Sequence, residues 1–197
     1  MKLIITRHGE TEENKLGIFQ GHLPGKLSSL GIKQAKKLAL RLKDEKIDFI
    51  YSSDLTRSSD TAKEIAKFLP NISIKFVKDL RERHLGELQG KKKSDLGWGN
   101  KNSHTLFLGI KGGEPMEDLY IRAEKFLNKV LSKHHKDTVL FVAHNGINKA
   151  LIAVITGKKC EDIKDMENHH NTSVNIFEID ENKNHQMYTF NCIKHLE

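Results

Sequence analysis

Four clusters of polar residues follow the apolar runs that the sequence predicts as strands. They occupy residues 7–10, 52–57, 80–83 and 144–146. Ligands of open α/β sheets bind at the carboxyl ends of the strands, so these clusters are expected to meet at one edge. They would bring arginines, two histidines and a glutamate together there. A set of this kind suits phosphoryl transfer, because several fixed donors are needed to hold a phosphate dianion.

Each residue type has a defined part in such chemistry. The planar guanidinium of arginine matches phosphate oxygens. A histidine beside a glycine-flexed turn can act as a nucleophile through a neutral ring nitrogen, and a second, cationic histidine can hold a phosphate oxygen. A single carboxylate, without a second one in a comparable place, suits a general acid rather than a metal cage. Backbone N–H groups at the start of the helix predicted from Gly146 also favour an anion.

These residues also have ordinary structural interpretations. Arg57, in the first turn of a predicted helix, is typical of a surface ion pair. Glu82 lies between Arg81 and Arg83 and could form an exposed ion pair worth less than about 1 kcal/mol. The three lysines at 91–93 suggest a solvated loop tip. All of these interpretations would have to hold at the same edge of the sheet, which favours a functional site.

The predicted elements that position these residues alternate between strands and helices. The strands are 2–6, 48–51, 72–77 and 138–143, the helices are 29–46, 56–69, 117–133 and 146–156, and a hairpin of 173–179 and 186–192 follows. This order predicts an α/β fold with a mostly parallel central sheet and helices on both faces. Residues 1–197 are expected to form a single domain, with long loops at 8–27 and 79–113. Residues 83–113 are expected to be a variable region that faces the substrate.

Composition excludes several classes of protein. The chain has 197 residues, is 37% hydrophobic and carries a net charge of +7, which favours anionic partners. No apolar stretch approaches the roughly 18 residues of a membrane span, and the apolar run at 2–6 is too short for a signal sequence. The two cysteines, Cys160 and Cys192, are expected to be reduced thiols. A cytoplasmic protein without membrane association is predicted.

Five blocks of residues resemble the histidine phosphatase superfamily, the group that includes the cofactor-dependent phosphoglycerate mutases. They are Leu3-Ile4-Ile5-Thr6-Arg7-His8-Gly9-Glu10-Thr11, Ser52-Ser53-Asp54-Leu55 with Arg57, Leu80-Arg81-Glu82-Arg83-His84-Leu85-Gly86, Gly112-Gly113-Glu114 with Arg122, and Val142-Ala143-His144. The blocks stand in the family's order and span residues 2 to 156. The resemblance implies a phosphoglycerate mutase-like fold.

The resemblance also implies a role for individual residues. His8 would be the phosphorylated nucleophile, and Glu82 would protonate the leaving oxygen and then deprotonate water. The implied phosphate pocket consists of Arg7, Arg57, His144, Asn14, Gln20 and Gly21. Asn145 stands where the family usually has glycine. Its backbone N–H stays available to a phosphate oxygen, and its side chain could narrow the pocket or reach the substrate. The family uses neither a metal nor an organic cofactor, so none is expected here.

The function predicted from these residues is metal-independent hydrolysis of a small phosphorylated metabolite through a phosphohistidine intermediate. The first alternative is a cofactor-dependent phosphoglycerate mutase, whose cover over the site would be a much longer insertion than residues 91–111 provide here. The second is a non-catalytic module that binds anions or nucleic acid. The sequence lacks an aromatic stacking platform and a helix-turn-helix, which disfavours nucleic acid. The identity of the substrate and the oligomeric state are left open.

Overall fold

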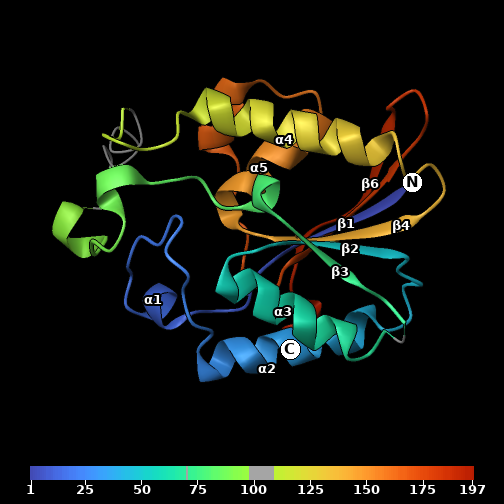
Figure 1. Cartoon of the computed structure of the whole chain (residues 1–197), viewed down its shortest axis with the longest axis horizontal. Coiled ribbons are helices and arrows are strands. Elements are labelled where there is room, and N and C mark those ends of the chain that lie inside the picture. The colour runs from blue at the N-terminus through green and yellow to red at the C-terminus, as the bar shows by residue number, and fades with distance from the viewer. Residues whose placement is uncertain (70, 98–108) are drawn as a thin grey trace.

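The computed structural model describes residues 1–69, 71–97 and 109–197. Its centre is a six-stranded sheet in the order β3-β2-β4-β1-β5-β6 (Figure 1). The strands are β1 (Lys2–Arg7), β2 (Phe49–Ser53), β3 (Ile74–Val77), β4 (Thr138–Ala143), β5 (Val174–Ile179) and β6 (His185–Cys192). Strands β1 to β4 are parallel, and β5 and β6 add an antiparallel hairpin beside β1. The predicted fold class is confirmed.

Helices cover both faces of the sheet (Figure 1). They are α1 (Glu12–Lys15), α2 (Ser29–Leu42), α3 (Thr56–Ala66), α4 (Met116–Leu131) and α5 (Asn145–Ile155). Successive residues of a strand point to opposite faces. Leu3 and Ile5 of β1 therefore pack in the core beneath α4 and α5, while Ile4 packs in the core shared with α2 and α3. Central strands buried on both faces explain the continuous apolar runs of β1 and β4.

Several predicted boundaries differ from the structure. Helix α2 ends at Leu42 instead of residue 46, α3 ends at Ala66 instead of 69, and β3 begins at Ile74 instead of 72. The proline expected to stop α3, residue 70, lies outside the described residues. Element ends are where local pattern is weakest, because frayed terminal turns bury few apolar side chains.

The two predicted long loops contain short helices. Within 8–27, α1 is held by a reciprocal cap in which the Thr11 side chain accepts from the Asn14 backbone and the Asn14 side chain accepts from the Thr11 backbone. The predicted loop 79–113 holds short 3-10 helices at Gly86–Leu88 and Ser94–Leu96, and its residues 98–108 lie outside the described part. Such short elements have too few residues to show a hydrophobic period.

Two smaller expectations also concern the whole chain. Cys160 and Cys192 are free thiols, as predicted. Among the described residues, no helix is both long and apolar enough to cross a membrane.

Candidate active site

The carboxyl ends of β1 and β4 place two histidines on either side of one arginine. His8 follows β1, and His144 follows β4 as the residue that caps α5; their rings lie 5.1 Å apart between centroids. Between them, Arg57 Nε donates to His8 Nε2 and to His144 Nδ1, each at 3.2 Å. Arg57 is only 1% exposed. It is therefore part of a buried site, and the surface ion pair considered from sequence is wrong.

Arg57 reaches this position because it lies in the first turn of α3, directly beyond the end of β2. Its Nη1 and Nη2 donate to backbone oxygens of the first loop, at Leu23 (2.5 Å), Pro24 (3.3 Å) and Gly21 (2.8 Å). Burial lowers the pKa of Arg57 to about 10, so the guanidinium stays charged at neutral pH. The cation thus fastens the first loop to the strand ends while remaining beside both histidines.

Hydrogen bonds define which ring nitrogen of His8 carries the proton. His8 Nδ1 lies 2.7 Å from the Gly9 carbonyl, which can only accept, so Nδ1 carries the proton and Nε2 has a lone pair. Burial first, and then Arg57 and Arg7, hold the pKa of His8 well below its usual value. A neutral ring with an unprotonated Nε2 is the form that a nucleophile requires.

His144 differs from the cationic histidine expected from sequence. Burial first, and then Arg57, hold its pKa well below the ordinary value, so the ring is neutral. Because its Nδ1 accepts from Arg57, the proton lies on Nε2. Nε2 is buried and has no hydrogen-bond partner among the described residues. His144 can therefore offer a phosphate oxygen an N–H donor, without a charge of its own.

Arg7 and the backbone of His8 are positioned by a segment that the sequence did not identify. Arg7 Nη1 donates to the His169 carbonyl at 2.6 Å, and Asn171 Nδ2 donates to the His8 carbonyl at 2.9 Å. Arg7 Nε is buried and has no partner among the described residues. Burial is also the main cause that lowers the pKa of Arg7. Residues 169–171 thus hold the end of β1 while leaving one arginine donor unused.

Glu82 lies against the start of α5 and forms no exposed ion pair. Its Oε1 accepts from the backbone N–H of Arg83 (2.9 Å) and of Ile147 (3.3 Å), and its Oε2 accepts from Gly146 (3.1 Å). A Cβ at Gly146 would stand 2.5 Å from Oε1, so only glycine permits this approach. The group that takes the place expected for an anion at the start of the helix is therefore the Glu82 side chain. Arg81 pairs with Asp54 instead, at 2.6 Å.

The remaining predicted residues take different positions. Asn14, Gln20 and Gly21 line the same cavity as His8, and Gln20 Oε1 is buried with no partner among the described residues. The Asn145 side chain binds a neighbouring segment: Nδ2 donates to Asn168 Oδ1 at 3.0 Å, and Oδ1 accepts from the His169 N–H at 2.8 Å. The side chain was expected to narrow the pocket or reach the substrate. Instead, both its amide nitrogen and its amide oxygen are bonded to protein groups.

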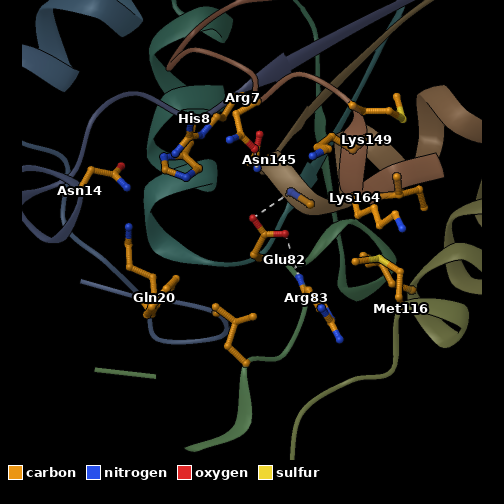
Figure 2. A pocket seen from close by; sticks show the side chains of 18 of the residues that line it. Arg7, His8, Asn14, Gln20, Glu82, Arg83, Met116, Asn145, Lys149 and Lys164 are labelled. Carbon is orange, nitrogen blue, oxygen red and sulfur yellow. Dashed lines mark hydrogen bonds between the residues drawn. The ribbon is translucent and has the colours of Figure 1, made fainter. Parts of the chain in front are cut away.

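A cavity of about 610 Å³ joins these residues (Figure 2). We call one side the Arg–His half, lined by Arg7, His8, Asn14, Gln20 and Arg57. The other side, the Lys–Met half, is lined by Met116, Leu119, Lys149, Ile163, Met166 and Asn168. Glu82 and Asn145 lie between the halves (Figure 2). The apolar side chains of the Lys–Met half offer contacts to the organic part of a small phosphate ester.

The predicted variable region 83–113 also contributes to this cavity. Arg83, Leu85 and Lys93 line it, while residues 98–108 lie outside the described part. The Lys93 ammonium stands 5.5 Å from the centroid of the Phe19 ring, and burial is the main cause that lowers its pKa. The lysine run was expected to be a solvated loop tip, and for Lys93 that expectation is wrong.

The cavity is electropositive and suits an anion. In the described part of the chain, no group of three or more histidine, cysteine, aspartate or glutamate side chains is placed to hold a metal ion. The buried guanidinium of Arg57 and unpartnered N–H donors at Arg7 and His144 instead converge beside a nucleophilic nitrogen. Such an arrangement can bind a phosphate and accept its phosphoryl group.

The chain belongs to the histidine phosphatase superfamily (branch 1), whose sequence profile it matches over residues 3–191. A metal-independent phosphoserine phosphatase from Arabidopsis thaliana is 36% identical over 165 residues, covering 79% of this chain and 68% of that protein. Phosphoglycerate mutase-like protein 4 from the same plant is 32% identical over 206 residues, covering 100% of this chain and 87% of its own.

Solved structures agree with this assignment. A phosphoserine phosphatase from Entamoeba histolytica, solved in complex with 3-phosphoglyceric acid, superposes with a TM-score of 0.84 at 27% identity, covering 100% of this chain and 99% of that one. Proteins named phosphoglycerate mutase also match the sequence. The predicted family is confirmed, and the chain is a phosphoric monoester hydrolase of the histidine phosphatase type, as expected.

Proposed function

We propose that the chain hydrolyses a small phosphorylated metabolite in two steps, through a phosphoryl group carried on His8 Nε2 and without a metal ion. The observation that carries the proposal is the unprotonated Nε2 of His8, buried beside the Arg57 guanidinium at 3.2 Å. A neutral nitrogen with a cation beside it is a nucleophile already placed where a phosphate dianion binds. The family resemblance gives the same role to His8.

In the first step, the Arg–His half binds the phosphate. Arg7 and Arg57 contact its oxygens, His144 Nε2–H donates to one of them, and Asn14, Gln20, the Gly21 turn and the Asn145 backbone N–H complete the pocket. His8 Nε2 forms a bond to phosphorus as the bond to the leaving oxygen breaks. Glu82 enters this step protonated on Oε2 and transfers that proton to the oxygen, so a neutral alcohol departs. The Gly9 carbonyl keeps the proton on His8 Nδ1 throughout.

In the second step, Glu82 accepts a proton from water, and the water oxygen attacks phosphorus. The phosphorus–nitrogen bond breaks, inorganic phosphate leaves and His8 returns to its neutral form. Both lone pairs of Glu82 Oε1 are used by two backbone N–H groups, whereas Oε2 accepts from one. Oε2 is therefore the atom that carries the proton between the two steps.

Relatives named as phosphoserine phosphatases support a small carboxylate-bearing metabolite as substrate. The phosphoglycerate mutase reaction is the second candidate, because curated relatives also carry that name. A mutase must keep water from phosphohistidine while its intermediate reorients. We keep hydrolysis as the proposed reaction because residues 91–111 are too short for an extensive cover. Free thiols at Cys160 and Cys192 support a cytoplasmic location, which we also propose.

The deciding experiment measures two rates on one enzyme preparation. Phosphate release from phosphoserine and 3-phosphoglycerate is followed beside interconversion of 3- and 2-phosphoglycerate, with 2,3-bisphosphoglycerate present. We expect release to be the faster reaction and to survive saturating EDTA. Interconversion faster by about tenfold or more would replace hydrolysis with the mutase reaction. Loss of activity on chelation, restored by a divalent ion, would refute the metal-independent mechanism.

A further inference from the structure

Lys149 is a buried cation in the Lys–Met half of the cavity. It lies one helical turn after Asn145 on α5, and its side chain is 7% exposed. Figure 2 shows its ammonium directed toward Asn145, at the junction with the Arg–His half. Residues spaced by one turn share a helix face, which explains why Asn145 and Lys149 line the same cavity.

Lys149 forms no hydrogen bond or ion pair with any residue that the structure describes. Its ammonium still reaches the cavity, because the nitrogen atom is not completely buried. Burial is the main cause that lowers its pKa, while the charges of Glu82 and Asp165 act in the opposite direction. Burial of most of the side chain removes part of the hydration of the ammonium, and no described protein group pairs with it in return, which costs stability. Such a group is explained if a ligand supplies the missing anion.

One feature of the Lys–Met half indicates the charge of that anion. A second phosphate would need several cationic donors, but among the described residues of this half Lys149 is the buried lysine, and beside it the exposed Lys164 is accompanied by the carboxylates of Asp165 and Glu167. These carboxylates would repel a dianion more strongly than a monoanion. Beyond Lys149, Met116, Met166 and Leu119 offer apolar contacts to a short carbon skeleton. A single carboxylate on a small organic group fits both properties.

We propose that Lys149 is a specificity-determining residue that binds a carboxylate on the leaving group of the phosphate ester. This inference rests on the hydrolysis proposed above and narrows its substrate to carboxylate-bearing phosphomonoesters. The phosphate occupies the Arg–His half, and the carboxylate pairs with the ammonium across the junction marked by Asn145. Lys149 takes no part in bond breaking.

Two matched substrate pairs test this role. Phosphoserine and phosphoethanolamine differ only by a carboxylate, and 3-phosphoglycerate differs from glycerol 3-phosphate by a carboxylate in place of a hydroxymethyl group. We expect the unmodified enzyme to prefer the carboxylate member of a pair by about 10- to 100-fold in kcat/KM, the value of one charged hydrogen bond. In Lys149→Met, we expect that preference to fall to within about threefold, mainly through a higher KM.

The matched control is Lys164→Met. Lys164 lies at the rim of the same cavity but is exposed, so solvent screens its charge, and no step of the proposal uses it. We expect this variant to keep the substrate preference within about twofold. Thermal unfolding supplies a readout other than activity. Removing an unpartnered buried cation should leave the melting temperature of Lys149→Met unchanged or higher, whereas loss of a structural ion pair would lower it.

The outcomes separate this inference from the proposed function. If Lys149→Met lowers kcat/KM equally for both members of a pair, Lys149 acts on the phosphate or on Glu82, and the carboxylate role is refuted. An unmodified enzyme without preference for carboxylates refutes it too. If no phosphate ester is hydrolysed, the proposed function itself fails. Binding of phosphoserine to His8→Ala, weakened by a further Lys149→Met change, would still support the carboxylate site.

Discussion

The two halves of the cavity are built in different ways. In the Arg–His half, both arginines and the nucleophile are fixed by the backbone: Arg57 donates to three carbonyls, Arg7 donates to a fourth, and His8 Nδ1 donates to the Gly9 carbonyl. In the Lys–Met half, Lys149 has no partner among the described residues, and flexible methionines line the same half of the cavity. The first half is preorganised for one ligand group, and the second becomes fully paired only when substrate binds.

This difference assigns the two halves different tasks. A preorganised set of donors lowers the barrier of the chemical step, because no reorganisation is needed as charge develops. Contacts to the distant part of a substrate mainly decide which substrate binds. Changes in the Arg–His half should therefore affect kcat for every substrate. Changes in the Lys–Met half should affect KM for some substrates and spare others.

The largest effect is expected from His8→Ala. The variant loses the nitrogen that accepts the phosphoryl group in the proposed mechanism, so turnover should fall by a factor of about a thousand or more for all substrates. Quenched reactions of the unmodified enzyme should show an acid-labile, base-stable phosphoryl group that this variant lacks. Retention of more than a few per cent of turnover by a folded His8→Ala protein would refute the nucleophile assignment.

A smaller but selective effect is expected from Glu82→Gln. The amide keeps the shape of the side chain but cannot donate or accept the catalytic proton, so turnover of alkyl phosphates should fall by about 100- to 1,000-fold. The first step should suffer far less with p-nitrophenyl phosphate, whose leaving oxygen needs no proton. A burst of p-nitrophenol in rapid-mixing experiments measures this difference. Equal loss of the burst and of alkyl phosphate turnover would contradict the role of Glu82.

The contrast between the halves also shows what the sequence could predict. Arg7, His8, Glu82 and His144 follow strands or precede a helix, and parallel topology brings such ends together. Their convergence could therefore be predicted. The neutral state of His144 could not, because it depends on burial and on the nearby Arg57 charge. Fold class was predictable for the same reason as convergence, since it follows from the alternation of elements.

The Lys–Met half was harder to predict from the sequence. It is assembled from the start of α4, the 3-10 helix Cys160–Asp165 and residues 166–168, which share no repeating pattern. One signal was available, because Lys149 stands one turn after Asn145 in a helix that was predicted. Asn171 gave no signal, since its bond to the His8 carbonyl joins segments far apart in the chain. Side chains that connect distant segments need a tertiary structure to be recognised.

A third prediction concerns His169, whose backbone bonds to the side chains of Arg7 and Asn145. His169 is 1% exposed, and burial, followed by the charges of Arg7 and Lys149, lowers its pKa to about 3. Between this pH and the usual value of about 6.5, the unfolded chain binds more protons than the folded chain, so stability rises with pH. Between pH 7 and pH 5, His169 should account for a loss of about 2 kcal/mol.

Urea unfolding at both pH values measures this contribution. His169→Gln should remove about 2 kcal/mol of the difference in stability between pH 7 and pH 5. His170→Gln is the matched control, because His170 is the exposed neighbour and should leave that difference unchanged. The same pH dependence in all three proteins would show that His169 is protonated in the folded state at pH 5, and its imidazole would then be charged there.

The smallest effect is expected from Asn145→Ala, at the residue between the two halves. The Asn145 side chain bonds Asn168 Oδ1 and the His169 N–H, and both partners belong to the segment that borders the Lys–Met half. Asn145→Ala removes these bonds and leaves the backbone at the start of α5 in place. We expect KM for carboxylate substrates to rise by about three- to tenfold, the value of about one hydrogen bond, with kcat lowered by less than about twofold.

Asn168→Ala tests whether the Asn145 side chain acts by holding residues 168–169 in place or by contacting the substrate. If Asn145 acts through the segment, Asn168→Ala should raise KM in the same direction, and the double variant should be less impaired than the product of the two single effects. Fully multiplicative effects, or a large fall in kcat for Asn145→Ala alone, would mean that the amide touches the substrate directly. Asn145 would then belong to the Arg–His half, whose residues affect the chemical step, and the residues that select the substrate would begin after it on α5.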